Sequence, residues 1–272
     1  MITLRPRHRF TVPVDAECIT PDSFADKSIE EIAALQAWEG NRKRVLGDLF
    51  KIEGETSAMQ EKVSIHIFED VSKVRRIGAG MSMGEIVVEG SAGMHLGEGM
   101  KGGSITVSED AGSWAGCMMS GGTLEIKGDV GDYVGAPYRG STKGMGGGLI
   151  VVHGNAGNEV GCFMRKGLIK VHGNIGQFAG VHMKKGTIFV EGKCEGRAGA
   201  EMVGGKIIIC AYIPSVLPTF TIDTIKPKVK VNGEVILGPF YQFIGDLADN
   251  GNGKLFVSQT KNPHLKFYEK YL

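Results

Sequence analysis

The sequence predicts an all-β protein, a right-handed parallel β-helix with 19-residue coils. The first observation is a motif that recurs seven times between Gly78 and Ile209: a methionine, a glycine three residues later, and apolar residues two and four positions after that glycine. The second is a G-x2-G-x3-G pattern between most of these segments. A fixed period of about 20 residues with alternating apolar side chains is typical of a solenoid, in which each coil buries its apolar face only against its neighbours.

Each coil is expected to stack like residues on like residues. The motif returns at the same interval each time, except for one interval that is longer by seven residues. Left-handed β-helices have hexapeptide repeats, so the different glycine pattern found here favours the right-handed form. Four internal columns follow from the register, formed by Met81, Met100, Met119, Met145, Met164, Met183 and Met202; by Ile86, Ile105, Leu124, Ile150, Ile169, Ile188 and Ile207; by Val88, Val107, Ile126, Val152, Val171, Val190 and Ile209; and by Ala92, Ala111, Val130, Ala156, Ile175 and Cys194.

The repeat divides the chain into three expected parts. Residues 1–60 form an N-terminal cap and leader, residues 61–213 the β-helix, and residues 214–272 an extension that caps the C-terminal end. Caps are expected because an unpaired terminal coil is a sheet edge that invites association. After Pro214 the glycine pattern ends, and residues 229–235 predict a hairpin around an Asn-Gly turn.

The N-terminal part predicts one short helix and two imperfect early coils. Ser28 and Glu31 form a capping-box signature, and Gly40 is the expected stop of this helix. The alternating apolar residues Phe50 and Ile52, and then 63–67, predict the early coils.

Charge and cysteine content exclude several classes of partner. Thirty-one basic residues balance 30 acidic residues, so we expect no nucleic-acid or membrane partner. The sequence has no apolar run long enough to cross a bilayer and no signal-peptide pattern, which favours a cytoplasmic protein. Five cysteines without a C-x-x-C motif argue against a disulfide framework and against an iron–sulfur or zinc site.

The sequence contains none of the spacings that catalysis demands. GxSxG, HExxH and GxxxxGK[ST] are all missing, so we assign no catalytic residue, no metal ligand and no cofactor site within the chain. His153 and His172 occupy equivalent positions in consecutive repeats and share one outward column. They are expected either to bridge a metal or, the interpretation we favour, to form a solvated surface pair.

A basic corner is the one candidate contact for a polyanion or a partner. No acidic residue occurs between Val160 and Val190, and four cations are expected to stack on one corner of two consecutive coils: Arg165, Lys166, Lys184 and Lys185. Stacked like charges repel each other, and an anionic ligand or surface would offset that cost. The alternative is a solvated edge that discourages strand addition.

The seven extra residues of the long interval are Ala136 to Thr142. They leave the columns on both sides in register, so they are expected to bulge outward as a loop. We expect this loop to contact a partner protein; the alternative is a solvated excursion.

The glycine-rich coils from Gly78 to Gly205 resemble the C-terminal β-helix of the glutamate synthase large subunit. The whole chain resembles a narrower family, the C subunit of formylmethanofuran dehydrogenase. This second resemblance rests on the leader from Leu4-Arg5-Pro6 through Gly47-Asp48-Leu49-Phe50 and on the tail segments Phe243-Ile244-Gly245-Asp246-Leu247-Ala248 and Gly253-Lys254-Leu255-Phe256-Val257.

The resemblance implies a non-catalytic structural subunit of a complex that carries out the first step of methanogenesis, the reduction of carbon dioxide to formate and its fixation on methanofuran. The implied partners are an amidohydrolase-like A subunit with a dinuclear metal site and pterin-binding B and D subunits. Those partners are expected to carry tungstopterin or molybdopterin and iron–sulfur clusters. Two alternatives remain: the homologous subunit of a formyltransferase/hydrolase complex, or a ligand-handling module that binds the polyglutamate arm of methanofuran.

Overall fold

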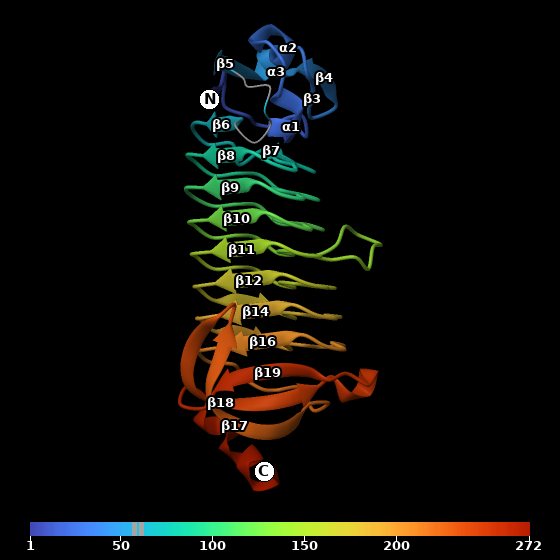
Figure 1. The fold of residues 1–272 in the computed structure, drawn as a ribbon, viewed down its shortest axis with the longest axis vertical. Coiled ribbons are helices and arrows are strands. Elements are labelled where there is room, and N and C mark those ends of the chain that lie inside the picture. The colour runs from blue at the N-terminus through green and yellow to red at the C-terminus, as the bar shows by residue number, and fades with distance from the viewer. Residues whose placement is uncertain (56–58, 60–62) are drawn as a thin grey trace.

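The computed structural model describes residues 1–55, 59 and 63–272. The chain is mostly β, and its main feature is a large mixed, largely parallel sheet (Figure 1). Within the described residues this sheet has 13 strands, in the order β17-β18-β19-β16-β14-β12-β11-β10-β9-β8-β6-β1-β5. Its parallel centre consists of β6 (Ser64–Ile67), β8 (Glu85–Val88), β9 (Ser104–Val107), β10 (Thr123–Ile126), β11 (Leu149–Val152), β12 (Leu168–Val171), β14 (Thr187–Val190) and β16 (Lys206–Ile209).

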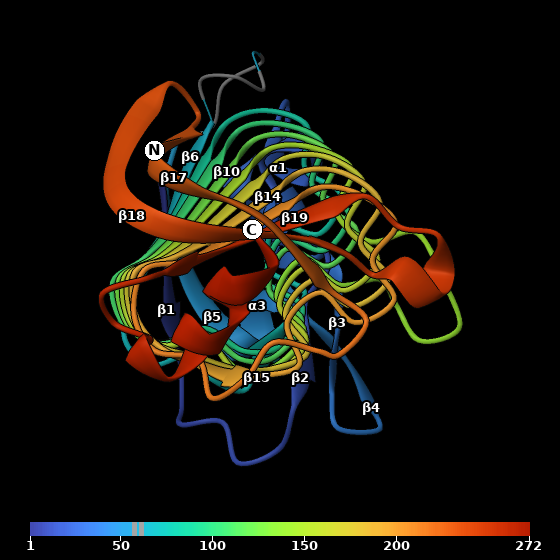
Figure 2. The same ribbon diagram turned by 90° about the horizontal axis from the view of Figure 1, so that it is seen from below.

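The strand register is the one that the repeat predicts. Ile169 pairs with Ile150 on one side and with Ile188 on the other. The side chains of the isoleucine, valine and methionine columns are fully buried. We use the term rung for one repeat together with its strand, and Figure 2 shows the rungs lying one behind the other when viewed along the stack. Similar apolar side chains therefore fill the inside of the stack in columns.

A second line of parallel pairing runs along the stack. Isolated bridges join Val71, Ala92, Ala111, Val130, Ala156 and Ile175 in succession. The line ends in the short strands β13 (Ile175–Gln177) and β15 (Cys194–Gly196), which pair with each other. The small buried column predicted from the sequence is therefore confirmed. The right-handed sense of the coil stays a prediction. The division of the chain into residues 1–60, 61–213 and 214–272 also stays a prediction, and its first boundary, at residues 60 and 61, lies outside the described residues.

The N-terminal part is a small α/β cap on the first rung (Figure 1). It contains β1 (Ile2–Pro6), β2 (Val14–Asp15), α1 (Pro21–Phe24), α2 (Ile29–Ala33), β3 (Gln36–Glu39), β4 (Arg42–Val45), α3 (Leu46–Leu49) and β5 (Phe50–Gly54). The capping box of Ser28 and Glu31 is present in full. The prediction that the helix stops at Gly40 was wrong, because α2 ends at Ala33 and Gly40 lies in the turn between β3 and β4.

The prediction of an early coil at Phe50 and Ile52 was also wrong. β5 runs antiparallel to β1 and forms an edge of the sheet, so Phe50 and Ile52 do not begin a coil. β6 pairs in parallel with β1 and β8, which makes the segment at Ile65 the first rung strand. The remaining strand of this region, β7 (Val74–Arg75), pairs with β2 in a second sheet of order β4-β3-β2-β7.

The C-terminal part covers the other end of the stack. It contains β17 (Thr221–Val231), β18 (Glu234–Gly245), the 3-10 helix η2 (Leu247–Asp249), β19 (Gly253–Ser258) and the 3-10 helix η3 (Pro263–Tyr271). The predicted hairpin is confirmed, since Asn232 and Gly233 both have positive φ in the turn between β17 and β18. β19 pairs in parallel with β16, so the extension adds a further strand to the ladder. Among the described residues, no helix has the length and apolar character needed to cross a membrane.

Candidate functional site

The predicted basic corner is present on the surface. Arg165, Lys166, Lys184 and Lys185 are exposed and lie in the turns before β12 and β14. These turns are adjacent, because the backbone N–H of Lys184 donates to the carbonyl of Met164 at 2.8 Å. In the part of the chain that the structure describes, no acidic side chain forms an ion pair with any of the four cations. Their charge is therefore available to a partner outside the chain.

The predicted histidine pair is present too. The rings of His153 and His172 stack with their centroids 5.0 Å apart. His153 Nε2 lies 2.7 Å from a carboxylate oxygen of Glu125, and His172 Nδ1 lies 2.9 Å from a carboxylate oxygen of Glu191. Because each ring already has a carboxylate partner and is partly exposed, the geometry favours the surface pair over a bridging metal.

A column of outward, mostly half-buried residues forms a second corner. Each member has a left-handed backbone, with φ between 54° and 68°, a conformation that is uncommon for residues other than glycine. Its members are Arg76, His95, Trp114, Tyr133, Glu159, Phe178 and Arg197. The ring of Trp114 stacks on His95 with centroids 5.4 Å apart and on Tyr133 with centroids 4.4 Å apart. We call His95, Trp114 and Tyr133 the aromatic corner.

The seven-residue insertion projects from the side of the stack between β10 and β11 (Figure 1). Its tip also packs back on the aromatic corner: the Arg139 guanidinium lies 5.5 Å from the Trp114 ring centroid, and the Tyr138 ring lies 6.0 Å from the His95 ring. The loop and the corner enclose a hollow of about 230 Å³. Tyr138 remains 54% exposed, so an aromatic side chain is offered to the outside. Aromatic and arginine residues in such a position are typical of protein interfaces.

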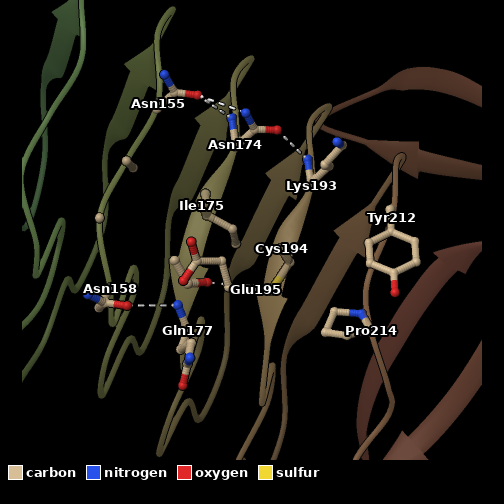
Figure 3. Close-up of a pocket in the computed structure, with 13 residues that line it drawn as sticks. Asn155, Asn158, Asn174, Ile175, Gln177, Lys193, Cys194, Glu195, Tyr212 and Pro214 are labelled. Atoms are coloured by element: carbon tan, nitrogen blue, oxygen red, sulfur yellow. Dashed lines mark hydrogen bonds between the residues drawn. The ribbon is translucent and has the colours of Figure 1, made fainter.

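A larger hollow is the groove of about 760 Å³ beside β13 and β15 (Figure 3). Amide side chains line it, and their oxygens accept hydrogen bonds from backbone N–H groups of the next rung. The side-chain oxygen of Asn155 accepts the backbone N–H of Asn174 at 2.9 Å, and that of Asn174 accepts the N–H of Lys193 at 2.9 Å. Asn158 does the same for Gln177 at 2.9 Å. Because these ladders satisfy backbone donors between rungs, we interpret the groove as a structural surface.

The five cysteines, all among the described residues, are unpaired thiols. Burial raises the pKa of Cys117 and of Cys162 to about 12, with a further contribution from Glu98 and from Glu159 respectively. Both thiols are therefore protonated at neutral pH, as expected for structural cysteines.

Two features escaped the sequence analysis. The aromatic corner belongs to a column that mixes charged and aromatic residues, so residue type alone did not reveal it. The signal that could have revealed it is that His95, Trp114 and Tyr133 occupy equivalent positions in three consecutive repeats. The second is Glu98, a carboxylate in a column that otherwise holds only small apolar residues or cysteine: Ala79, Cys117, Ala136, Cys162, Val181 and Ala200.

Comparisons with known proteins agree on one family. Over 95 residues, 35% of this chain, the sequence is 42% identical to the C subunit of molybdenum-containing formylmethanofuran dehydrogenase 1 of Methanosarcina barkeri and 45% identical to the C subunit of tungsten-containing formylmethanofuran dehydrogenase 2 of Methanothermobacter thermautotrophicus. These matches span only about a third of the relatives, 32% and 35% of their length. No family model matches the chain.

A solved structure extends the similarity to nearly the whole chain. One chain of the crystal structure of the formyltransferase/hydrolase complex (FhcABCD) from Methylorubrum extorquens, determined in complex with methylofuran, is 33% identical with a TM-score of 0.81. The match covers 94% of this chain and 99% of that chain. The fold and its surfaces define a β-rich repeat protein whose charged and aromatic residues surround a stacked apolar core. Within that class, the chain belongs to the family of the matched chain of the formyltransferase/hydrolase complex, and over about a third of its length it is homologous to the C subunit of formylmethanofuran dehydrogenase.

Proposed function

We propose that this chain is a non-catalytic structural subunit of a formylmethanofuran dehydrogenase complex, and that its rungs form a right-handed β-helix on which the catalytic subunits dock. The observation that carries the proposal is the match over 94% of the chain to a component of a multi-subunit complex that was crystallised with methylofuran. The names of the matched relatives support a molybdenum- or tungsten-containing dehydrogenase. The homologous place in a formyltransferase/hydrolase complex is the alternative.

The physical character of the stack supports a docking role. A rung is held on both sides by backbone pairing and by full columns of buried side chains, so its outer face is preorganised. A partner that docks on such a face orders few additional side chains, and less of the binding free energy is lost to conformational entropy. The exposed Tyr138 on the insertion loop and the basic corner are the two surfaces that we assign to partner contacts.

The catalytic chemistry is assigned to the other subunits. We propose an amidohydrolase-like subunit with a dinuclear metal site and pterin-binding subunits with molybdopterin or tungstopterin and iron–sulfur clusters. In this arrangement the present chain fixes the distance and orientation between catalytic sites without contacting the reacting atoms.

Affinity purification of the tagged full chain from its native host, followed by mass spectrometry, tests the composition of the complex. Recovery of pterin-binding and amidohydrolase-like subunits in fixed ratio is the expected result. Recovery of a formyltransferase without any pterin-binding subunit selects the alternative complex. A chain that purifies alone at native concentration contradicts both.

A second candidate function is the binding of a polycarboxylate arm of a methanofuran-type cofactor at the basic corner. The support is the set of four exposed cations to which no described residue contributes a compensating acid. Each contact would be largely Coulombic and therefore screened by salt. The test replaces Arg165, Lys166, Lys184 and Lys185 with Gln in the assembled complex and measures the KM for methanofuran at low ionic strength.

The matched control removes the same number of charges elsewhere, by replacing the exposed Lys226, Lys228, Lys230 and Lys261 with Gln. A raised KM for the corner variant only, with little change in turnover of formate, supports the cofactor track. An unchanged KM in an intact complex eliminates it. Loss of assembly in the corner variant assigns the corner to subunit docking.

A further inference from the structure

Glu98 is the one charged residue in its column of the repeat. The repeat places a residue of this column at the outer corner of every rung, and the other rungs use alanine, valine or cysteine there. A carboxylate in a partly buried apolar position is costly unless a cation or hydrogen bonds compensate it. The next residue of the same column, one rung further along, is Cys117, whose side chain is fully buried. Glu98 and Cys117 are therefore a carboxylate and a buried thiol at equivalent positions of consecutive rungs.

His95 completes a group of three metal-binding side chains. The ligand atoms of His95, Glu98 and Cys117 all lie within 4.8 Å of one another. His95 Nδ1 lies 3.1 Å from Glu98 Oε2. Both atoms are buried, and neither has a partner with hydrogen-bond geometry among the described residues. The two atoms form an ion pair with each other, and Arg76 Nε lies 3.6 Å from the same Glu98 oxygen, but neither contact has the geometry of a full hydrogen bond. Nitrogen, oxygen and sulfur donors therefore meet at this point without a saturated hydrogen-bond network.

The local charge also calls for a cation. Arg76 contacts three carboxylates: Asp15 at 3.6 Å from Nη1, Glu98 at 3.6 Å from Nε, and Glu17. Three negative charges and one positive charge leave a net charge of −2 at this corner. Deprotonation of Cys117 on metal binding adds a fourth negative charge, so a divalent cation reduces the net charge of this group from −3 to −1, and Arg76 keeps Asp15 and Glu17 as partners when Glu98 turns to the metal.

We propose that His95, Glu98 and Cys117 bind one divalent transition metal of the zinc class through an imidazole nitrogen, a carboxylate oxygen and a thiolate. A nitrogen, oxygen and sulfur donor set suits Zn²⁺ and disfavours Mg²⁺ and Ca²⁺, which prefer oxygen ligands. Ligand atoms around tetrahedral zinc lie about 3.5 Å apart, as metal–ligand distances of about 2.0 to 2.3 Å require. The ligand atoms of His95, Glu98 and Cys117, now within 4.8 Å of one another, reach this spacing with side-chain shifts of about 1 Å. Binding converts the Cys117 thiol to a thiolate, and the proton passes to solvent.

The surroundings of the ligands suit such a site. The indole of Trp114 stacks on the His95 ring with an interplanar angle of 3°, which fixes the orientation of the imidazole. The backbone N–H of Gly99 donates to the carbonyl of Cys117 at 2.7 Å, which holds the two rungs together at the ligands. A metal at this point joins two rungs and supports the aromatic corner on which the insertion loop rests.

Metal titration of the purified full chain tests the site. The chain is treated with a chelator under reducing conditions, dialysed, and titrated with Co²⁺ and with Zn²⁺. The expected result is saturation at one metal per chain, a thiolate-to-cobalt charge-transfer band in the near ultraviolet, and a higher melting temperature in excess Zn²⁺. Absence of saturable binding by the unmodified chain overturns the proposal.

Three variants separate the site from adventitious binding. Glu98→Ala is expected to fold, because alanine occupies this column in three other rungs. Loss of a residue that only supports a metal ligand lowers metal affinity by about 10- to 100-fold. Because Glu98 is proposed as a ligand itself, Glu98→Ala is expected to lower Zn²⁺ affinity by more than this. Cys117→Ser is expected to lose the charge-transfer band. Cys162→Ser removes another buried thiol of the same column and is expected to bind like the unmodified chain. Unchanged binding in Glu98→Ala and Cys117→Ser overturns the assignment of these ligands.

Discussion

Replacing a corner glycine by alanine measures how tightly the rungs pack on each other. Gly161 and Gly80 both have left-handed backbones, with φ of +70° and +67°. A Cβ at Gly161 would lie 2.5 Å from Ile188 Cδ1 and 3.1 Å from Ile188 Cγ1, whereas a Cβ at Gly80 would meet nothing within 4 Å. The two substitutions therefore share the backbone strain and differ in the packing clash.

The size of the difference follows from these distances. Carbon atoms in contact prefer a separation of about 3.5 to 4.0 Å, so Ile188 must move by about 1 Å in a fully buried column. Left-handed backbone costs alanine about 1–2 kcal/mol at either position. Overpacking of a core adds about 1–3 kcal/mol at Gly161 only. We expect Gly161→Ala to lower the free energy of unfolding by about 2–5 kcal/mol and Gly80→Ala by about 1–2 kcal/mol.

Urea denaturation followed by circular dichroism provides the assay, with the free energy of unfolding taken from linear extrapolation at an unchanged slope. Equal losses of stability in the two variants would refute the reasoning, because they would mean that neighbouring rungs do not close over the corner glycines.

Three further predictions follow from the same structure. Ile169→Asp buries an unpaired charge between Ile150 and Ile188 and is expected to abolish soluble folding; a soluble variant with unchanged thermal unfolding contradicts the register. The structure places Ala136 of the predicted insertion in the buried column, so the deletion takes residues 137–143. It is expected to leave the isolated chain folded and to weaken assembly of the complex, as measured by native mass spectrometry; unimpaired assembly removes the loop from the interface. Burial raises the pKa of Cys162 from 9.0 to about 12, so alkylation of this thiol at pH 8 is expected to be about a thousandfold slower in the native than in the denatured chain, as quantified by mass spectrometry. Because the folded pKa is raised, this thiol stabilises the fold fully below about pH 9, and the contribution is lost as the pH rises toward 12; equal native and denatured alkylation rates contradict its burial.

The rungs were predictable because their signal repeats. The position of Ile169 in the sheet follows from a period that nearly every interval shares, and one apolar column supports the next. The hairpin at Asn232 and Gly233 and the capping box at Ser28 were predictable because each is set by a few adjacent residues.

The flanks were harder because their structure depends on distant partners. Gln36–Glu39 is a strand because β2 and β4 pair with it, although the preceding capping box suggested a longer helix. Alternation at Phe50 and Ile52 cannot distinguish a parallel rung from the antiparallel edge that forms on β1. β19 repeats the pattern of β16, with Gly253, Leu255 and Val257 in place of Gly205, Ile207 and Ile209, but the intervening hairpin hides the repeat.

The basic corner was found because its four cations are close in sequence and fall in equivalent positions of two repeats. The group of His95, Glu98 and Cys117 was missed because metal motifs are sought within one segment, whereas these ligands come from two rungs. The signal in the sequence is the single residue in a column that differs in type from the others, as Glu98 does, and it points to this group.

The most direct test of a structural, non-catalytic role is reconstitution of the complex with and without this chain. The separate subunits are purified, and turnover at each catalytic site is measured for the catalytic subunits alone, for this chain alone, and for the complete mixture. The account predicts no turnover by this chain alone, chemistry at the individual sites without it, and coupled turnover together with a single assembled species only when it is present. Turnover by the isolated chain, or full coupling and assembly in its absence, would contradict the account.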